Sequence, residues 1–261
     1  DRLICGDVGF GKTEVALRAA FITAMSGYQV ALVAPTTLLA RQHGRVFTER
    51  FGGFSVKIGV LSRMTPTATA KQIRADLETG DVQIVIGTHA LLAKSIKFNN
   101  LGLLIVDEEQ HFGVGQKERL KELRGDIHVV TLSATPIPRT LQMALSGVRE
   151  MSLIATPPVD RLAVRTFVGP WDGVVLREAI QREMFRGGQI FCVCPRIDDL
   201  QRVFDRVKKL APKARILTAH GRMAANELDD VMTRFADGEA DILLSTNIVE
   251  SGIDIPSANT M

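Results

Sequence analysis

The feature that most constrains this chain is residues 6–13, which read Gly-Asp-Val-Gly-Phe-Gly-Lys-Thr. Gly6 and Gly11 enclose four residues and are followed by Lys-Thr, which is the spacing of a phosphate-binding P-loop. The apolar run before the segment predicts a buried strand, and the residues after it are strong helix formers. The segment therefore lies between a strand and a helix, which is the context that a phosphate-binding loop requires.

The chemistry of this loop follows from its glycines and from the helix after it. Glycine lets backbone N–H groups approach phosphate oxygens closely, and the helix presents its positive N-terminus to the same anion. We expect Lys12 to reach the β- and γ-phosphates of ATP and the Thr13 hydroxyl to hold Mg²⁺. The remaining residues expected to line the nucleotide are Gly6, Asp7, Gly9 and Gly11.

Composition describes an ordinary globular protein. The chain has 261 residues, of which 46% are hydrophobic and 23% charged, so it is long enough for about two domains and is not intrinsically disordered. A net charge of +3 permits a polyanionic partner without requiring one. The three cysteines lie in apolar runs and read as reduced core thiols, and no apolar run is long enough to span a membrane. We expect a cytoplasmic protein with no membrane partner.

Strand-like and helix-like segments alternate along the chain, which predicts an α/β fold with parallel sheets covered by helices on both faces. In the first half the predicted strands are residues 29–34, 56–61, 82–86, 101–106 and 129–132. In the second half they are residues 162–168, 189–193, 214–218 and 242–245, with helices at 174–185, 200–210 and 228–235. Thr37 is the predicted cap of the helix that follows the strand at 29–34.

The alternation breaks at Pro157 and Pro158, whose polar flanks predict an interdomain linker. We therefore expect two domains, residues 1–156 and 157–261, of similar style and without a short sequence repeat. Only the first contains a P-loop. The chain starts on the P-loop strand and stops just after a motif-like stretch, so we expect it to be a piece of a longer protein.

Polar clusters follow several predicted strands, at the ends where ligands gather in α/β sheets. Asp107 and Glu108 follow a buried strand as a Walker B pair, with Asp107 as a Mg²⁺ ligand and Glu108 as the base that activates water. Gln110 is either a sensor of the γ-phosphate or a solvated turn residue. The Ser133-Ala134-Thr135 stretch is either a link from the nucleotide to the partner domain or a helix cap.

Two further strand ends suit the backbone of a polynucleotide. Pro35, Thr36 and Thr37 follow one strand, and Gly87 and Thr88 follow another. Hydroxyls and helix-start N–H groups hold phosphates without reading sequence. We therefore expect both segments to bind DNA, whereas His89 beside them can equally be a structural histidine.

These segments, in this order, resemble superfamily 2 helicases and translocases. The matching motifs are residues 6–13, 35–43, 87–89, 107–110 and 133–135 in the first half, and residues 220–223 and 245–256 in the second. The resemblance implies two tandem RecA-like domains that hold ATP between them. It also implies that Gly252 and Asp254 face the nucleotide from the second domain and that Thr246 contacts a DNA phosphate.

Residues 6–16, 103–114, 134–140 and 154–158 narrow the resemblance to bacterial transcription-repair coupling factors. That family implies a motor on double-stranded DNA that displaces stalled RNA polymerase and recruits excision-repair proteins through other domains. RecG-type fork-remodelling helicases share part of the pattern and are the alternative. A non-catalytic scaffold and an unrelated P-loop ATPase fit less well, because Lys12, Thr13, Asp107 and Glu108 are all present and no transporter signature loop lies between them.

The chain also departs from the family pattern at its ends. The upstream segment that reads adenine and the downstream motif VI, whose arginine completes the ATP site, are both missing from these 261 residues. We therefore expect a second RecA-like domain truncated at its C-terminus. An arginine of this kind stabilises charge that develops only in the transition state. We expect the 261-residue piece alone to be almost inactive as an ATPase.

Overall fold

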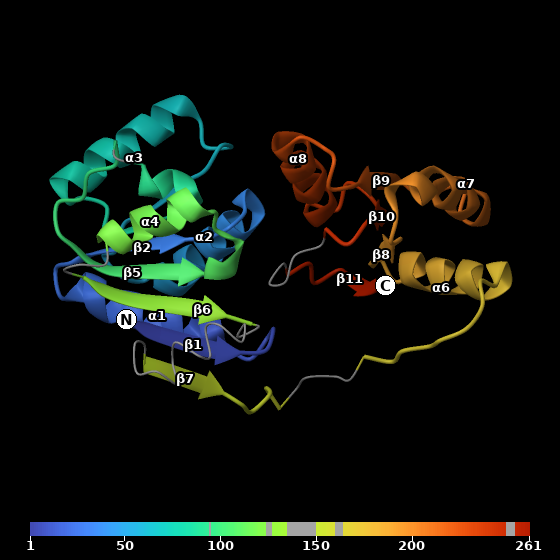
Figure 1. The fold of residues 1–261 in the computed structure, drawn as a ribbon, viewed down its shortest axis with the longest axis horizontal. Coiled ribbons are helices and arrows are strands. Elements are labelled where there is room, and N and C mark those ends of the chain that lie inside the picture. Colours follow the sequence, from blue (N-terminus) through green and yellow to red (C-terminus); the bar gives the residue numbers. More distant parts are fainter. Residues whose placement is uncertain (94, 124–126, 135–149, 160–163, 249–253) are drawn as a thin grey trace. The chain divides into compact units, whose positions relative to one another are not determined.

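The computed structural model describes residues 1–93, 95–123, 127–134, 150–159, 164–248 and 254–261. The chain divides into two compact units, residues 1–161 and 162–261 (Figure 1). The predicted boundary between residues 156 and 157 falls a few residues before this division. Each unit has a parallel sheet of its own, which confirms the predicted fold class.

The first unit is organised around a seven-stranded sheet with the strand order β3-β4-β2-β5-β6-β1-β7. Its strands are β1 (Arg2–Gly6), β2 (Gln29–Val33), β3 (Ile58–Leu61), β4 (Ile84–Gly87), β5 (Leu101–Asp107), β6 (His128–Ser133) and β7 (Glu150–Ile154). The described pairings are all parallel. Strands β2 and β4 are buried along their whole length, as in sheets that are covered on both faces.

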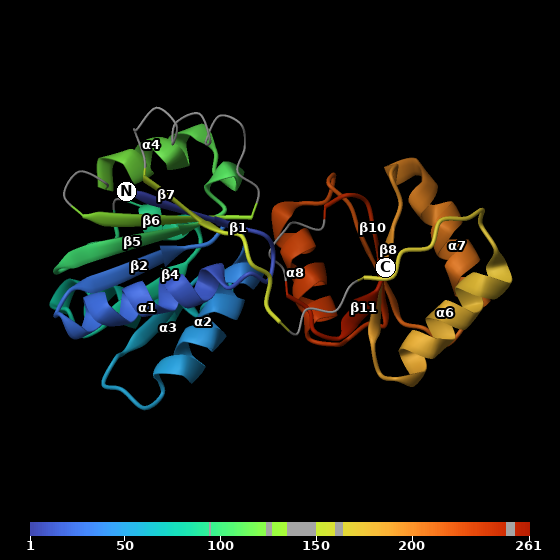
Figure 2. The same ribbon diagram turned by 90° about the horizontal axis from the view of Figure 1, so that it is seen from below.

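Helices cover both faces of this sheet, as the βαβα pattern predicts. They are α1 (Lys12–Met25), α2 (Thr37–Phe51), α3 (Thr67–Thr79) and α4 (Val114–Leu123), with short 3₁₀ turns η1 (His89–Leu92) and η2 (Glu109–His111). Helices α1 and α4 lie on opposite sides of the sheet (Figure 2). A core cluster joins Val33, Val85 and Val106 of the sheet to Leu77 of α3 and Leu120 of α4.

The second unit has a smaller sheet with the order β11-β8-β10-β9, and its described pairings are also parallel. Its elements are α6 (Gly173–Phe185), β8 (Gln189–Val193), η3 (Ile197–Asp199), α7 (Leu200–Leu210), β9 (Ile216–Ala219), α8 (Ala225–Ala236), β10 (Ile242–Ser245) and β11 (Ala258–Thr260). Ile180, Ile190, Val207 and Ile242 form the centre of its core. Within the part of the chain that the structure describes, none of the helices has the length and apolar character needed to cross a bilayer.

The predicted strand at residues 162–168 is wrong for the residues that can be checked. Residues 162 and 163 lie outside the described part of the chain, and residues 164–168 are not in a strand. Val164 and Phe167 are 90% and 89% exposed. The β-branched and aromatic residues here favour extended backbone, but a strand exists only where another strand pairs with it.

Strand β7 is an element that the sequence pattern does not reveal. It pairs with β1, with Leu3 opposite Met151 and Cys5 opposite Leu153, and forms one edge of the large sheet. Leu153 is 66% exposed. Its sequence, Glu-Met-Ser-Leu-Ile, alternates polar and apolar residues over its first four positions, so it lacks the continuous apolar run by which the buried strands are recognised.

Gln29, the first residue of β2, ties three segments of the first unit together from a buried position. Its side-chain nitrogen donates to the carbonyl oxygens of Leu77 and Val82 at 3.0 and 2.8 Å. Its side-chain oxygen accepts from the backbone N–H groups of Asn99 and Asn100. These bonds join the end of α3 and the start of β5 to β2, and they satisfy backbone groups that burial would otherwise leave unpaired.

Gln189, the first residue of β8, makes a matching set of bonds in the second unit. Its side-chain nitrogen donates to the carbonyl oxygens of Phe235 and Ala240 at 2.7 and 2.6 Å, and its oxygen accepts from the hydroxyl of Ser257. The two units thus share one hydrogen-bonding scheme around equivalent strands. Most of its partners are backbone groups, which carry no sequence signal, so the repeat is invisible in the sequence.

Candidate active site

The P-loop connects the buried end of β1 to the first turn of α1, as predicted. Gly9 and Gly11 have φ of 78° and 89°, a left-handed conformation that favours glycine. A Cβ on either residue would meet no atom within 4 Å, so the space beside the loop is open. The Lys12 ammonium lies in the loop itself, where it donates to the carbonyl oxygens of Gly6 and Asp7 at 2.8 and 3.2 Å.

The acidic pair ends β5 and enters a tight turn. Asp107 and Glu108 are 7% and 2% exposed. Among the described residues, Glu108 is the one non-glycine residue with a positive φ, 49°, and such strain gathers at functional sites. One oxygen of Glu108 accepts from the backbone N–H of Ala134 at 3.0 Å, and the other accepts from the Gln110 side-chain amide. Gln110 therefore contacts the predicted base rather than only solvent.

The strand order brings the P-loop, the acidic pair and the Ser133 stretch to one edge. Strands β5, β6 and β1 are neighbours, with Asp107 opposite Leu132 and Cys5 opposite Ser133. Parallel strands end at the same edge of a sheet, so the three segments that follow them are adjacent. Thr135 and residues 136–140, which belong to the same predicted motif, lie outside the described residues.

Cys5 is the penultimate residue of β1 and directly precedes Gly6, the first residue of the P-loop. Burial raises the pKa of its thiol, the positive charge of Lys12 opposes that rise, and the negative charge of Glu108 adds to it. The charges of Lys12 and Glu108, two groups of the predicted site, thus both affect this thiol. It is buried and reads as a packing residue, as the sequence predicts.

The residues at this edge fit ATP and Mg²⁺ in their chemistry. The loop offers an ammonium, and the space beside its glycines is open, which suits a polyphosphate held by loop N–H groups. Thr13 and Asp107 offer hard oxygen ligands of the kind that Mg²⁺ prefers. Mg²⁺ usually keeps waters and phosphate oxygens in its shell, so two protein ligands are sufficient.

His43, the last residue of the motif at 35–43, belongs to this site although no catalytic or binding role was predicted for it. Its Nε2 lies 2.8 Å from Oδ2 of Asp107, and both side chains are 10% exposed. The helical spacing of Ala40, His43 and Phe47 puts His43 on the buried face of α2. That spacing could have indicated a buried histidine, but its partner comes from a distant strand.

The two predicted phosphate-binding segments of the first unit lie side by side. Strands β2 and β4 are paired, and the N–H of Ala34 donates to the carbonyl oxygen of Gly87 at 2.8 Å. Residues 35–37 therefore start next to residues 87 and 88. A Cβ on Gly87 would come within 2.3 Å of the carbonyl oxygen of Leu61, so close strand packing requires glycine at this position.

The threonines of these segments have different environments. Thr36, not Thr37, caps α2: its hydroxyl accepts from the N–H of Leu39 at 3.3 Å. The predicted cap was thus wrong by one residue, because Thr36 is the last residue with extended backbone. Thr37 and Thr88 are 3% and 5% exposed, which leaves Thr36 and the half-buried Pro35 as the more accessible residues.

In the second unit, Thr246 follows β10 and is buried, with its N–H donating to the carbonyl oxygen of Ala219 at 3.2 Å. Ser245 before it has a buried hydroxyl without a partner among the described residues. Gly252 lies outside the described residues, and Asp254 is exposed. The roles of Gly252, Asp254 and Thr246 stay predictions. The structure describes each unit separately, whereas these roles involve ligands that both units are predicted to bind.

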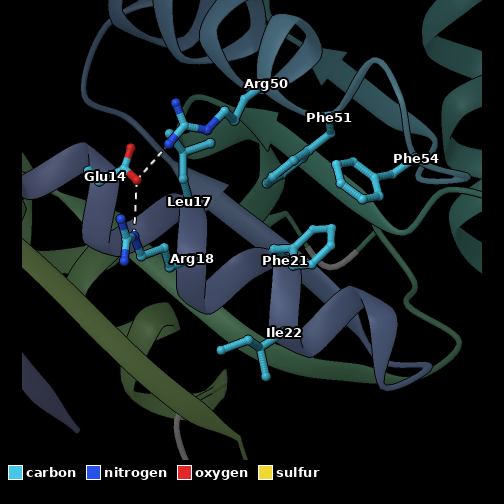
Figure 3. Close-up of a pocket in the computed structure, with 8 residues that line it drawn as sticks. All are labelled: Glu14, Leu17, Arg18, Phe21, Ile22, Arg50, Phe51 and Phe54. Carbon is cyan, nitrogen blue, oxygen red and sulfur yellow. Dashed lines mark hydrogen bonds and ion pairs between the residues drawn. The ribbon is translucent and has the colours of Figure 1, made fainter.

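A hollow of about 400 Å³ lies beside α1, between that helix and the end of α2 (Figure 3). Its walls are mainly apolar, and Phe21 contacts Phe51 and Phe54 with ring centroids 5.6 and 4.8 Å apart. Glu14 at its rim pairs with Arg50 and Arg18. Neither the P-loop lysine nor the acidic pair lines this hollow, so it is separate from the predicted site.

Comparison with known proteins decides the family. Residues 1–144, more than half of the chain, match the model of the DEAD/DEAH box helicases. The chain belongs to the DEAD/DEAH box helicase family. Residues 174–261 of this helicase chain match the helicase conserved C-terminal domain. The chain thus carries both domains of a helicase-type motor core.

Curated relatives of this helicase chain are named transcription-repair-coupling factors. Those of Rickettsia bellii, Bacillus subtilis and Escherichia coli are 55%, 51% and 51% identical over the full chain. The match confirms the predicted resemblance. The chain spans 22–24% of the length of these relatives.

Among solved structures, RecG bound to a three-way DNA junction matches 99% of the helicase chain and 35% of its own, with 37% identity and a TM-score of 0.81. Yeast Dbp5 bound to RNA and ADP BeF3 matches 99% of the chain and 68% of its own, with a TM-score of 0.68. At 19% identity, the second likeness shows the fold alone.

Proposed function

We propose that this chain is the motor core of an ATP-dependent translocase on double-stranded DNA. The observation that carries the proposal is the shared sheet edge of the first unit. There the P-loop and the acidic pair follow β1 and β5. The two segments that we predict to bind DNA phosphates follow β2 and β4, which lie on the other side of β5. ATP chemistry and DNA grip are thus carried by the ends of adjoining strands.

In the proposed hydrolysis, the P-loop N–H groups and Lys12 hold the phosphates, and Thr13 and Asp107 hold the metal ion. Mg²⁺, when bound, neutralises charge on the phosphates. Glu108 orients the attacking water and accepts its proton, and Gln110 holds Glu108 by its amide. Gly252 and Asp254 of the second unit complete the nucleotide site.

In the proposed DNA grip, residues 35–37 with Gly87 and Thr88 bind backbone phosphates from the first unit, and Thr246 binds one from the second. Such contacts position a duplex without reading its sequence. ATP binding closes the two units and hydrolysis opens them. Two grips that alternate with this cycle move the motor along the backbone.

We further propose that the whole protein displaces stalled RNA polymerase and couples transcription to excision repair, with both partners bound by regions outside this chain. Relatives that are named transcription-repair-coupling factors, at 51–55% identity, support this proposal. The RecG type, at 37% identity in the solved structure, is the alternative. Coupling factors and RecG-type helicases share the motor core and differ in the substrate on which it acts.

The test uses the full-length protein with ATP and three substrates: plain duplex, a stalled RNA polymerase elongation complex, and a model replication fork. Polymerase release and duplex-stimulated ATP hydrolysis, without regression of the fork, are the expected results. Fork regression without polymerase release would favour the RecG type. No ATP hydrolysis on any substrate would contradict the motor itself.

A further inference from the structure

His43 connects two parts of the candidate site that the proposed function treats separately. We propose that His43 is a positioning residue, which orients the Asp107 carboxylate and couples DNA contact at the start of α2 to metal binding at the end of β5. The inference rests on the proposed function, which supplies its ligands, DNA and the metal ion. The contact between His43 and Asp107 that carries the inference is observed in the structure itself.

The contact is short and shielded from water. Nε2 of His43 lies 2.8 Å from Oδ2 of Asp107, and each side chain is 10% exposed. An ionised carboxylate can only accept, so the imidazole donates through Nε2–H. Among the described residues, His43 is the one side chain that hydrogen-bonds to this carboxylate. Its hydrogen bond therefore sets the orientation of the carboxylate and leaves the second oxygen as the metal ligand.

The backbone of His43 is held by close packing of α2. The next residue, Gly44, lies so near β3 that a Cβ on it would come within 2.7 Å of a Val60 methyl group. Phe47 and Phe51, one and two turns further on, are buried. Because the helix is packed closely on this face, we expect the backbone of His43 to move together with the rest of α2.

The same helix starts at the predicted DNA contact. Thr36 caps α2, and His43 lies seven residues later on the same face, about 10 Å along the helix. A phosphate that binds at the N-terminus of α2 acts on the same rigid element that contacts Asp107 through His43, near its middle. Rigid elements with two arrangements are the physical means by which distant sites affect each other.

This arrangement has two measurable consequences. Removal of a residue that hydrogen-bonds to a metal ligand typically lowers metal affinity about 10-fold to 100-fold. If α2 also transmits DNA contact, DNA must change the affinity of the metal–nucleotide complex. By linkage, that complex must change DNA affinity by the same factor.

The experiment compares His43→Leu and His43→Gln in the full-length protein, with His128→Ala as the control. Leucine fills the site without a donor and glutamine restores an N–H donor. His128 is an exposed histidine at the start of β6, outside the segments predicted to bind ATP or DNA. Mn²⁺ affinity in the presence of ADP is measured by electron paramagnetic resonance, with and without duplex DNA. Thermal melting reports folding, and steady-state ATP hydrolysis gives kcat and KM.

We expect His43→Leu to weaken Mn²⁺ binding at least about 10-fold and to abolish the effect of DNA on it, whereas His43→Gln keeps most of both. The control should match the wild type. Unchanged Mn²⁺ affinity in His43→Leu, or equal losses in both variants, would overturn the inference. A wild-type protein without DNA-stimulated hydrolysis would contradict the proposed function instead, and the Mn²⁺ measurement without DNA would still test the contact.

Discussion

Nζ of Lys12 donates to the carbonyl oxygen of Gly6 at 2.8 Å, so the charge that is predicted to meet ATP is held by its own loop. A carbonyl oxygen is a weaker partner for an ammonium than an anionic phosphate is. The carbonyl oxygen of Gly6 thus holds the lysine near the end of β1 until an anionic phosphate replaces it as the acceptor. This relationship makes the contribution of Lys12 to binding separable from its contribution to folding.

The first prediction is that Lys12→Ala lowers ATP affinity more than about 10-fold and changes the free energy of unfolding by less than about 0.5 kcal/mol. Labelled-nucleotide binding and thermal melting measure the two quantities. Lys71→Ala, an exposed lysine of α3, is the control and should change neither. Equal ATP affinity in Lys12→Ala and wild type would refute the role of Lys12.

The second prediction concerns Glu108 in the full-length protein. Glu108→Gln keeps the shape and an oxygen for the N–H of Ala134, but it loses the base. We expect ATP and Mg²⁺ binding to persist while kcat falls about 100-fold to 10,000-fold. Glu109→Gln, the neighbouring carboxylate, should retain most activity. Wild-type turnover by Glu108→Gln would show that another group activates the water.

The third prediction is that duplex affinity is independent of base sequence and falls steeply with salt. Thr36→Val should lower it about 3-fold to 10-fold for every sequence, because a phosphate contact is lost. It should also cost about 1 kcal/mol of stability, because the cap of α2 is lost. Thr36→Ser keeps the hydroxyl and should restore both. Fluorescence anisotropy with several duplexes checks this, and losses limited to one sequence would contradict it.

The fourth prediction concerns the buried Gln189. Gln189→Met leaves the carbonyl oxygens of Phe235 and Ala240 without their side-chain donor, so we expect a loss of about 2–4 kcal/mol. Urea unfolding followed by the fluorescence of Trp171, the single tryptophan, measures it in the second unit. Gln201→Met, at an exposed position of α7, is the control. A loss no larger than that of the control would mean that these bonds add little.

The fifth prediction is a pH dependence in the second unit. Hydrogen bonds from Arg215 hold the pKa of Asp241 below its ordinary value. A lowered folded-state pKa gives stability that is present above the unfolded pKa, about 3.9, and is lost as pH falls through the folded value. Asp241→Asn should therefore be less stable than wild type at pH 7, and the difference should shrink below pH 4. The same Trp171 unfolding experiment checks this, and a constant difference would contradict it.

The sequence pattern was sufficient to predict those elements whose structure depends on residues close together in the chain. Glycines at positive φ, a lysine-threonine pair and an apolar run before them specify the P-loop, because each acts within a few residues of chain. Buried parallel strands are continuous apolar runs, so the sequence by itself determined β2, β4 and β5 and put Asp107 and Glu108 at a strand end. Alternation of such runs with helices determined the α/β class.

Tertiary structure alone decided which distant residues meet. The contact of His43 with Asp107 spans two elements, and the bonds of Gln29 and Gln189 are made largely to backbone groups that every residue type possesses. Residues 164–168 have the composition of a strand but pair with no strand in the described part of the chain, whereas β7 has a partner without the composition of a buried strand. In each case the deciding interaction lies between segments far apart in the chain, and the pattern within either segment does not contain it.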